Sequence, residues 1–247
     1  MRDLNDYQCQ YGDYSFEDIL LRYRKKKIIE ILNEYKPKRI LEIGCGNDPL
    51  FLHYNKFEEF CIVEPSTRFF ENAVKVAGTN DNTERIVIRN NFLENDLDFL
   101  KDKNFDFVIL AGLLHEVESP SIMLESVHRI INEDAILHIN VPNAHSLHRL
   151  IALHAGLIED ICELSESNKR FQQNTVFQLD QIKHLLVENS FEILDYGTIF
   201  IKPFTHSQMQ KLVDLEILND AIMDGLFKAT STLSDLGSEI YLNVKVK

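Results

Sequence analysis

Two glycines one residue apart, with a carboxylate at the end of the next predicted strand, have the types and spacing that could support chemistry. The apolar run 39–43 leads directly into Gly44 and Gly46, and the next apolar run, 60–63, ends at Glu64. Glycines let a ligand approach the backbone where a Cβ would clash. A carboxylate at this strand tip can accept hydrogen bonds from both hydroxyls of a ribose. The pattern therefore predicts a nucleoside pocket at the carboxyl ends of parallel strands.

The residues after the second glycine separate two kinds of nucleoside site. A dinucleotide site needs a third glycine, as in G-x-G-x-x-G, and places a pyrophosphate on a helix N-terminus. Here Asn47, Asp48 and Pro49 follow, and the charge of Asp48 would repel a pyrophosphate. S-adenosylmethionine carries no phosphate and has two cationic groups, so acidic residues near the turn suit it. The run 41–46, together with Glu64, resembles the first two motifs of class I S-adenosylmethionine-dependent methyltransferases. A nicotinamide enzyme and a tight turn without a ligand are the alternatives.

The resemblance implies a set of cofactor contacts around this turn. In the family's pattern the tip of the third strand, here 85–90, meets the adenine. Asn91 would accept a hydrogen bond from the exocyclic amine, and Phe92 would pack on the ring. Many relatives carry Asp at the position of Asn91, which leaves that contact open. The implied cofactor-binding residues are Glu42, Gly44, Cys45, Gly46, Glu64, Pro65, Ser66, Asn91, Phe92, Leu93, Ala111 and Gly112.

A histidine follows the next predicted strand, 105–111. The segment 114–117, Leu-His-Glu-Val, resembles the family's fourth motif, and the residue after this strand normally lies beside the transferred methyl group. We expect His115 to be the catalytic base for an alcohol acceptor, because imidazole titrates near neutrality. Glu116 would orient it, and a purely structural histidine is the alternative. The Asn/Asp-Pro-Pro-Tyr/Phe signature of amino-methylating enzymes does not occur here, which disfavours transfer to an exocyclic amine.

Basic and polar residues on both sides of this core are the candidates for binding an acceptor. The cluster 22–27 on the predicted helix 16–35 is either a solvated face or a grip on a carboxylate or phosphate. His145 and His148 are spaced i, i+3, but no acidic residue follows at a ligand-like spacing, so we expect no metal site. The candidate acceptor-binding residues are Tyr11, Tyr14, Arg22, Arg24, Glu116, Asn143, His145 and Arg149.

Predicted strands and helices alternate along the first part of the chain, which favours a parallel sheet. The resemblance implies an α/β fold, with a Rossmann-like, seven-stranded, mostly parallel sheet, an N-terminal helical segment and a helical cap insertion. We expect one methyltransferase domain over the whole of 1–247. Its parts are an N-terminal helical lid in 1–36, the cofactor-binding core in 37–142, a substrate cap in 143–180 and the completion of the sheet in 181–247.

Composition limits the partners and the compartment. A net charge of −13 over 247 residues argues against a large nucleic-acid surface. No apolar run reaches the length of about 18 residues that a membrane-spanning helix needs. The polar start of the chain does not resemble a signal peptide. The cysteines have no metal-ligand spacing and suit reduced thiols in a cytoplasmic protein. The apolar stretch 207–231 is expected to form a helix that packs on the sheet or joins two copies in a homodimer.

Three later segments resemble a narrower group within this family. The runs 140–149, 156–158 and 201–204 resemble bacterial methyltransferases of capsule, lipopolysaccharide and other surface-glycan pathways. Acceptors in such pathways are nucleotide-activated sugars or a nucleotide-linked phosphoramidate, and both are small anions. The resemblance implies O-methyl transfer to such an acceptor in bacterial capsular polysaccharide biosynthesis. The alternatives are a non-catalytic S-adenosylmethionine-binding partner subunit and a nicotinamide-dependent oxidoreductase.

Overall fold

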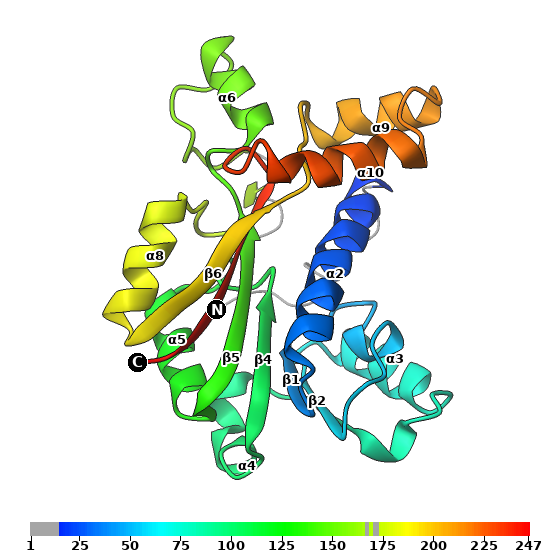
Figure 1. Ribbon diagram of the computed structural model, residues 1–247, viewed down its shortest axis with the longest axis vertical. Coiled ribbons are helices and arrows are strands. Elements are labelled where there is room, and N and C mark those ends of the chain that lie inside the picture. The colour runs from blue at the N-terminus through cyan, green and yellow to red at the C-terminus, as the bar shows by residue number, and fades with distance from the viewer. Residues whose placement is uncertain (1–14, 166–167, 170–172) are drawn as a thin grey trace.

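The fold is built on one seven-stranded sheet with the strand order β3-β2-β1-β4-β5-β7-β6 (Figure 1). The computed structural model describes residues 15–165, 168–169 and 173–247. The strands are β1 Arg39–Ile43, β2 Glu59–Val63, β3 Ile86–Arg89, β4 Phe105–Ala111, β5 Ile131–Pro142, β6 Phe191–Ile199 and β7 Glu239–Val246. Strands β1 to β5 pair in parallel, and β7 runs antiparallel to both of its neighbours, β5 and β6. The predicted Rossmann-like, mostly parallel sheet is confirmed.

Helices cover both faces of the sheet, which explains the continuous apolar runs in its central strands. The α-helices are α2 Ser15–Tyr35, α3 Thr67–Ala77, α4 Leu97–Leu100, α5 Pro120–His128, α6 Leu147–His154, α8 Leu179–Glu188, α9 His206–Asp214 and α10 Asp220–Lys228. Short 3₁₀ turns are η1 Leu50–Leu52, η2 Thr83–Arg85, η3 Leu93–Asn95 and η4 Ala229–Ser231. Helices α5 and α8 share one apolar cluster with the sheet, and α2 and α3 share another on the opposite face (Figure 1).

The apolar stretch 207–231 is not one helix, as the sequence suggested, but two. Helix α9 ends at Asp214, and Asn219 caps α10 by accepting a hydrogen bond from the Ile222 N–H at 3.0 Å. Both helices pack mainly on the N-terminal half of α2 rather than on the sheet. Met209 and Met223 lie in one buried cluster with α2 and the end of β6. This packing fixes the half of α2 that carries the basic residues 22–27.

No helix in the described parts of the chain combines the length and the apolar character that a membrane span requires.

A carboxyl group is buried inside β1. Glu42 is 5% exposed, and its Oε2 accepts a hydrogen bond from the Leu50 N–H at 3.1 Å. Burial raises the pKa of this carboxyl to about 8, because the hydrogen bond and the nearby charge of Lys25 compensate only part of the lost hydration. Glu42 therefore carries its proton at neutral pH.

We expect Glu42→Gln to gain stability relative to the wild type as the pH rises. The folded-state pKa lies above the unfolded one, so the free energy of unfolding of the wild type falls as the pH rises from about 4.5 to about 8. Over this range the unfolded state loses the proton while the folded state keeps it, and above pH 8 the loss of stability no longer increases. Urea unfolding at pH 5 and pH 8 should show the variant-minus-wild-type difference increasing by about 1 kcal/mol or more. Glu71→Gln, at an exposed position on α3, is the control for removing a carboxylate. An unchanged difference between the two pH values would contradict a buried, protonated Glu42.

Candidate active site

The turn after β1 takes a backbone conformation that favours glycine. Gly44 has φ 76° and Gly46 has φ 59°, both in the left-handed region. The Gly44 N–H donates to the Val63 carbonyl at 2.9 Å, so the turn is fastened to the end of β2. This places the glycine turn beside the residue that follows β2, which is Glu64.

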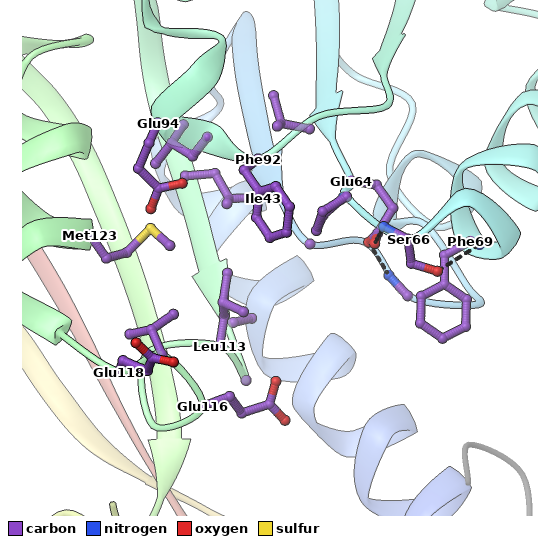
Figure 2. A pocket seen from close by; sticks show the side chains of 18 of the residues that line it. Ile43, Glu64, Ser66, Phe69, Phe92, Glu94, Leu113, Glu116, Glu118 and Met123 are labelled. Carbon is purple, nitrogen blue, oxygen red and sulfur yellow. Dashed lines mark hydrogen bonds between the residues drawn. The ribbon is translucent and has the colours of Figure 1, made fainter. Parts of the chain in front are cut away.

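Glu64 is held by backbone N–H groups. Its Oε1 accepts from the Ser66 N–H at 2.8 Å and its Oε2 from the Gly46 N–H at 3.3 Å. Ser66 also caps α3 through the Phe69 N–H at 3.3 Å. Burial raises the pKa of the Glu64 carboxyl, and these backbone hydrogen bonds oppose that effect. The carboxylate is thus fixed in one orientation at the wall of a cavity (Figure 2).

This first cavity has a volume of about 540 Å³ and lies at the carboxyl ends of β1, β2 and β4. Its apolar lining includes Ile43, Leu113 and Met123, and Phe92 lies between Glu94 and Glu64 in Figure 2. Four carboxylates line it: Glu64, Glu94, Glu116 and Glu118. Among the described lining residues the one Lys or Arg is Arg24, whose guanidinium is already paired with Glu239. The charge suits a cationic ligand and opposes a pyrophosphate.

Most of the implied cofactor-binding residues lie together at this cavity. They are Gly44, Gly46, Glu64, Pro65, Ser66, Phe92, Leu93, Ala111 and Gly112. Glu42 and Cys45 instead line a small space of about 50 Å³ that Gly44 and Gly46 also border. Asp48 does not line the first cavity, because it binds the ammonium of Lys25 and pairs with His53 at 2.9 Å.

Asn91, for which an adenine contact is expected, is not among the residues that line the first cavity. Its amide donates to the Asp96 carboxylate at 3.3 Å, and its Oδ1 accepts from the Phe92 N–H at 3.0 Å. Glu94 lines the cavity instead, and the sequence analysis missed it. The sequence did hold a signal for Glu94, because it is a carboxylate three residues after Asn91, at the end of the same predicted strand.

A second cavity, of about 410 Å³, meets the first. Both are lined by Arg24, Gly112 and Glu116. The remainder of the second cavity comes from the N-terminal half of α2, from the segment after β5 and from residues 202–207 and 238–239. The two cavities therefore share a boundary near the carboxyl end of β4, and a ligand in one would lie next to a ligand in the other.

His115 lines the second cavity and is 3% exposed. Its carbonyl accepts hydrogen bonds from the backbone N–H groups of Asn174 and Thr175, at 2.9 and 3.2 Å, so the segment after β4 is tied to the segment before α8. Its Nε2 lies 3.8 Å from Glu116 Oε1. A carboxylate at that distance supports the charged form of an imidazole.

The candidate acceptor-binding residues divide into two groups. Arg24, Glu116, Asn143 and Arg149 line the second cavity. Asn143 also has a structural role, because its amide donates to the carbonyls of Asp235 and Gly237 at 2.9 and 2.8 Å.

Arg22 and His145 lie away from both cavities, contrary to expectation. Arg22 pairs with Asp220 of α10 at 3.2 Å, and His145 is exposed. Tyr11 and Tyr14 lie outside the described residues.

Several residues that line the second cavity were not among the candidates, and His148, Lys202 and His206 belong to them. His148 belongs to the i, i+3 pair already noted, and it lines the cavity whereas His145 does not. Helical spacing does not say which of two residues faces inward. Lys202 lies in the segment 201–204 that carried the later resemblance. In the described parts of the chain, no three His, Cys, Asp or Glu side chains lie close enough together to hold a metal ion.

Comparisons with known proteins agree with this geometry. The family model described as "Methyltransferase domain" matches residues 18–196. Among solved structures, the chain is similar to a methyltransferase from Thermotoga maritima described as a possible histamine N-methyltransferase, with a TM-score of 0.60 and 19% identity over 99% of each chain. It is similar to the plantazolicin methyltransferase BamL, solved with S-adenosylhomocysteine, with a TM-score of 0.59 and 14% identity over 98% of this chain and 96% of that one. N-methyltransferase NodS from Bradyrhizobium japonicum WM9, also solved with S-adenosylhomocysteine, gives a TM-score of 0.58 and 11% identity over 98% and 96%. No curated protein shows significant sequence similarity to the chain.

The residues of the first cavity fit the cofactor of this family. The Glu64 carboxylate is fixed by backbone N–H groups at a strand tip, where it can accept ribose hydroxyls. The glycine turn exposes backbone without a Cβ, and the carboxylate-rich lining suits a sulfonium and an ammonium group. The chain belongs to the methyltransferase-domain family, and it is an S-adenosylmethionine-dependent methyltransferase.

Proposed function

We propose that the protein transfers a methyl group to the oxygen of a small anionic acceptor bound in the second cavity. The observation that carries this proposal is the boundary at Arg24, Gly112 and Glu116, where the cofactor cavity and the second cavity meet next to His115. Methyl transfer is an in-line displacement, so it needs two adjoining spaces of this kind.

The chain's own residues bind and orient the cofactor. Glu64 would hold the ribose, Phe92 and Leu93 would pack on the adenine, and Glu94 would take the role first assigned to Asn91. Glu42 and Cys45, beside the glycine turn, would lie on the methionyl side. When bound, S-adenosylmethionine would supply an activated methyl group on its sulfonium. The apolar part of the lining would limit the access of water to that group.

His115 is proposed as the general base that removes the proton of the acceptor hydroxyl. Its position in the second cavity, and the Glu116 carboxylate 3.8 Å from its Nε2, support this role. Glu116 would stabilise the imidazolium that forms. A nitrogen acceptor would not need this base to the same degree, because an amine is a nucleophile when neutral.

The acceptor class is proposed from charge and from the resemblance of segments 140–149 and 201–204 to surface-glycan methyltransferases. Arg149 and Lys202 line the second cavity and support an anionic acceptor. We therefore propose a nucleotide-linked phosphoramidate or a nucleotide-activated sugar of bacterial capsule biosynthesis. The plantazolicin methyltransferase and NodS share the fold, and their printed names concern other acceptors.

Mass spectrometry of the purified protein with S-adenosylmethionine and a panel of nucleotide-activated sugars and phosphoramidates tests this proposal. A product one methyl group heavier, with an equal amount of S-adenosylhomocysteine, is the expected result. Cofactor binding without a product from any acceptor would favour a non-catalytic partner subunit or a different acceptor class.

Glu64→Ala should weaken binding of S-adenosylhomocysteine by about tenfold to a hundredfold, because hydrogen bonds to a charged group contribute about 1.5–3 kcal/mol. Isothermal titration calorimetry measures the dissociation constant. Glu58→Ala is the matched control, since Glu58 pairs with Lys38 on the exposed surface just before β2. An unchanged dissociation constant in the Glu64 variant would remove the ribose assignment.

His115→Ala should lower kcat by about 10²- to 10⁴-fold, the usual contribution of a general base, with little change in affinity for S-adenosylhomocysteine. The exposed His145 gives the control, and His145→Ala should keep the wild-type rate. Steady-state kinetics and calorimetry on the same preparations separate the two effects. Full activity of the His115 variant would exclude it as the base.

A further inference from the structure

Lys202 is a buried cation that forms no ion pair with any carboxylate in the part of the chain that the structure describes. It follows β6 and is 3% exposed, and among the described residues the one hydrogen-bond partner of its Nζ is His206 Nδ1, at 3.1 Å. An ammonium can only donate, so His206 accepts through Nδ1 and its Nε2–H points to Glu17 Oε2 at 3.0 Å. The Glu17 carboxylate is thus engaged by His206 and, at 3.5 Å, by Arg24. The nearby acids Glu17 and Glu239 attract Lys202 only at longer range.

Arg149 is a second cation in the same cavity without a carboxylate partner in the described chain. Its guanidinium donates to two backbone carbonyls, those of Ile161, at 2.6 Å, and Glu163. These hydrogen bonds orient the side chain but do not neutralise its charge. The acids of the same loop, Asp160 and Glu163, have exposed side chains.

His148 adds a third polar group. Its Nδ1 is buried and has no hydrogen-bond partner among the described residues. Burial, together with the positive charges of Lys202, His206 and Arg149, lowers the pKa of His148 to about 2. Burial likewise lowers the pKa of Lys202 to about 8. Each of these shifts would be opposed by a negative charge placed among the three side chains.

A buried charge without a counter-charge is strongly destabilising, and a buried polar atom without a hydrogen bond is destabilising to a smaller degree. Lys202 is buried and Arg149 is half-buried, and within the described residues neither has a carboxylate partner. Together with the unpartnered Nδ1 of His148 at the same cavity, they indicate room for an anion. We propose that Lys202, Arg149 and His148 form a phosphoryl-binding subsite of the second cavity. Two positive charges match the two negative charges on the diphosphate of a nucleotide-activated sugar, and they also match inorganic phosphate, which carries about −1.5 to −2 and can serve as its probe. A carboxylate would leave one of the charges unbalanced.

The subsite lies away from the cofactor. None of Lys202, Arg149 and His148 lines the first cavity, whereas Arg24, Gly112 and Glu116 line both. The bound phosphoryl group is therefore not the group that is methylated. The acceptor carries its phosphoryl group at one end of the second cavity and its methylated oxygen at the boundary with the first. This assignment rests on the proposed function, but binding of a phosphoryl group can be measured without methyl transfer.

Thermal unfolding with and without inorganic phosphate at millimolar concentrations tests the subsite, without cofactor or acceptor. Phosphate should raise the Tm of the wild type in a concentration-dependent manner, and acetate at equal ionic strength should raise it less. Lys202→Met should keep or raise the Tm without phosphate, because it removes an uncompensated buried charge. The variant should weaken phosphate binding about tenfold or more. Lys211→Met, at an exposed position on α9, should behave as the wild type.

Two results would overturn the subsite. One is a Lys202 variant that loses stability without phosphate yet keeps the phosphate-induced shift, because Lys202 would then be a structural residue. The other is an equal shift with acetate and phosphate. Calorimetry with S-adenosylhomocysteine on the same variants measures cofactor binding separately, so a failure of the proposed function can be distinguished from a failure of the phosphoryl subsite. If the wild-type protein did not bind S-adenosylhomocysteine, the proposed function would be refuted, whereas the phosphate measurement would remain valid.

Discussion

The ion pair between Arg24 and Glu239 is the interaction on which the two cavities depend. Arg24 Nε donates to Glu239 Oε2 at 2.9 Å, and Nη2 donates to Oε1, so the pair is bidentate. The side chains are 14% and 7% exposed. Removing one partner of such a pair leaves a charge buried alone, which usually costs about 3–5 kcal/mol. The pair joins α2 to the start of β7 and places the guanidinium at the boundary between the cavities.

Gly112 makes room for this pair. Its φ is 69°, and a Cβ at this position would lie 3.3 Å from Arg24 Nη1. The predicted basic cluster 22–27 thus divides by role: Arg24 is engaged in the site, Lys25 binds Asp48 beside the glycine turn, and Arg22 pairs with α10 on the surface. Helices α9 and α10 complete the arrangement by packing on the same half of α2.

Short sequence patterns predicted those parts of the site whose positions depend on neighbouring residues in the sequence. The glycine turn and Glu64 could be found from the sequence because each follows a short strand, and adjacent parallel strands bring their ends together. The Asn91 amide binds Asp96, which also pairs with Arg89, and no strand pattern reveals such a contact. Arg24 and Glu239 are 215 residues apart, and Lys202 follows a different strand. These residues come together only through tertiary packing, so most of the lining of the second cavity could not be predicted from the sequence.

The antiparallel direction of β7 has a consequence for the time at which the site forms. Because β7 runs opposite to β4 and β5, its first residue, Glu239, lies at the edge where those strands end. During synthesis on the ribosome, Arg24 emerges 215 residues before its partner. β1 to β5 can pair before β7 is made, but the Arg24–Glu239 boundary between the two cavities needs β7. An incomplete chain that already holds the glycine turn therefore lacks this boundary.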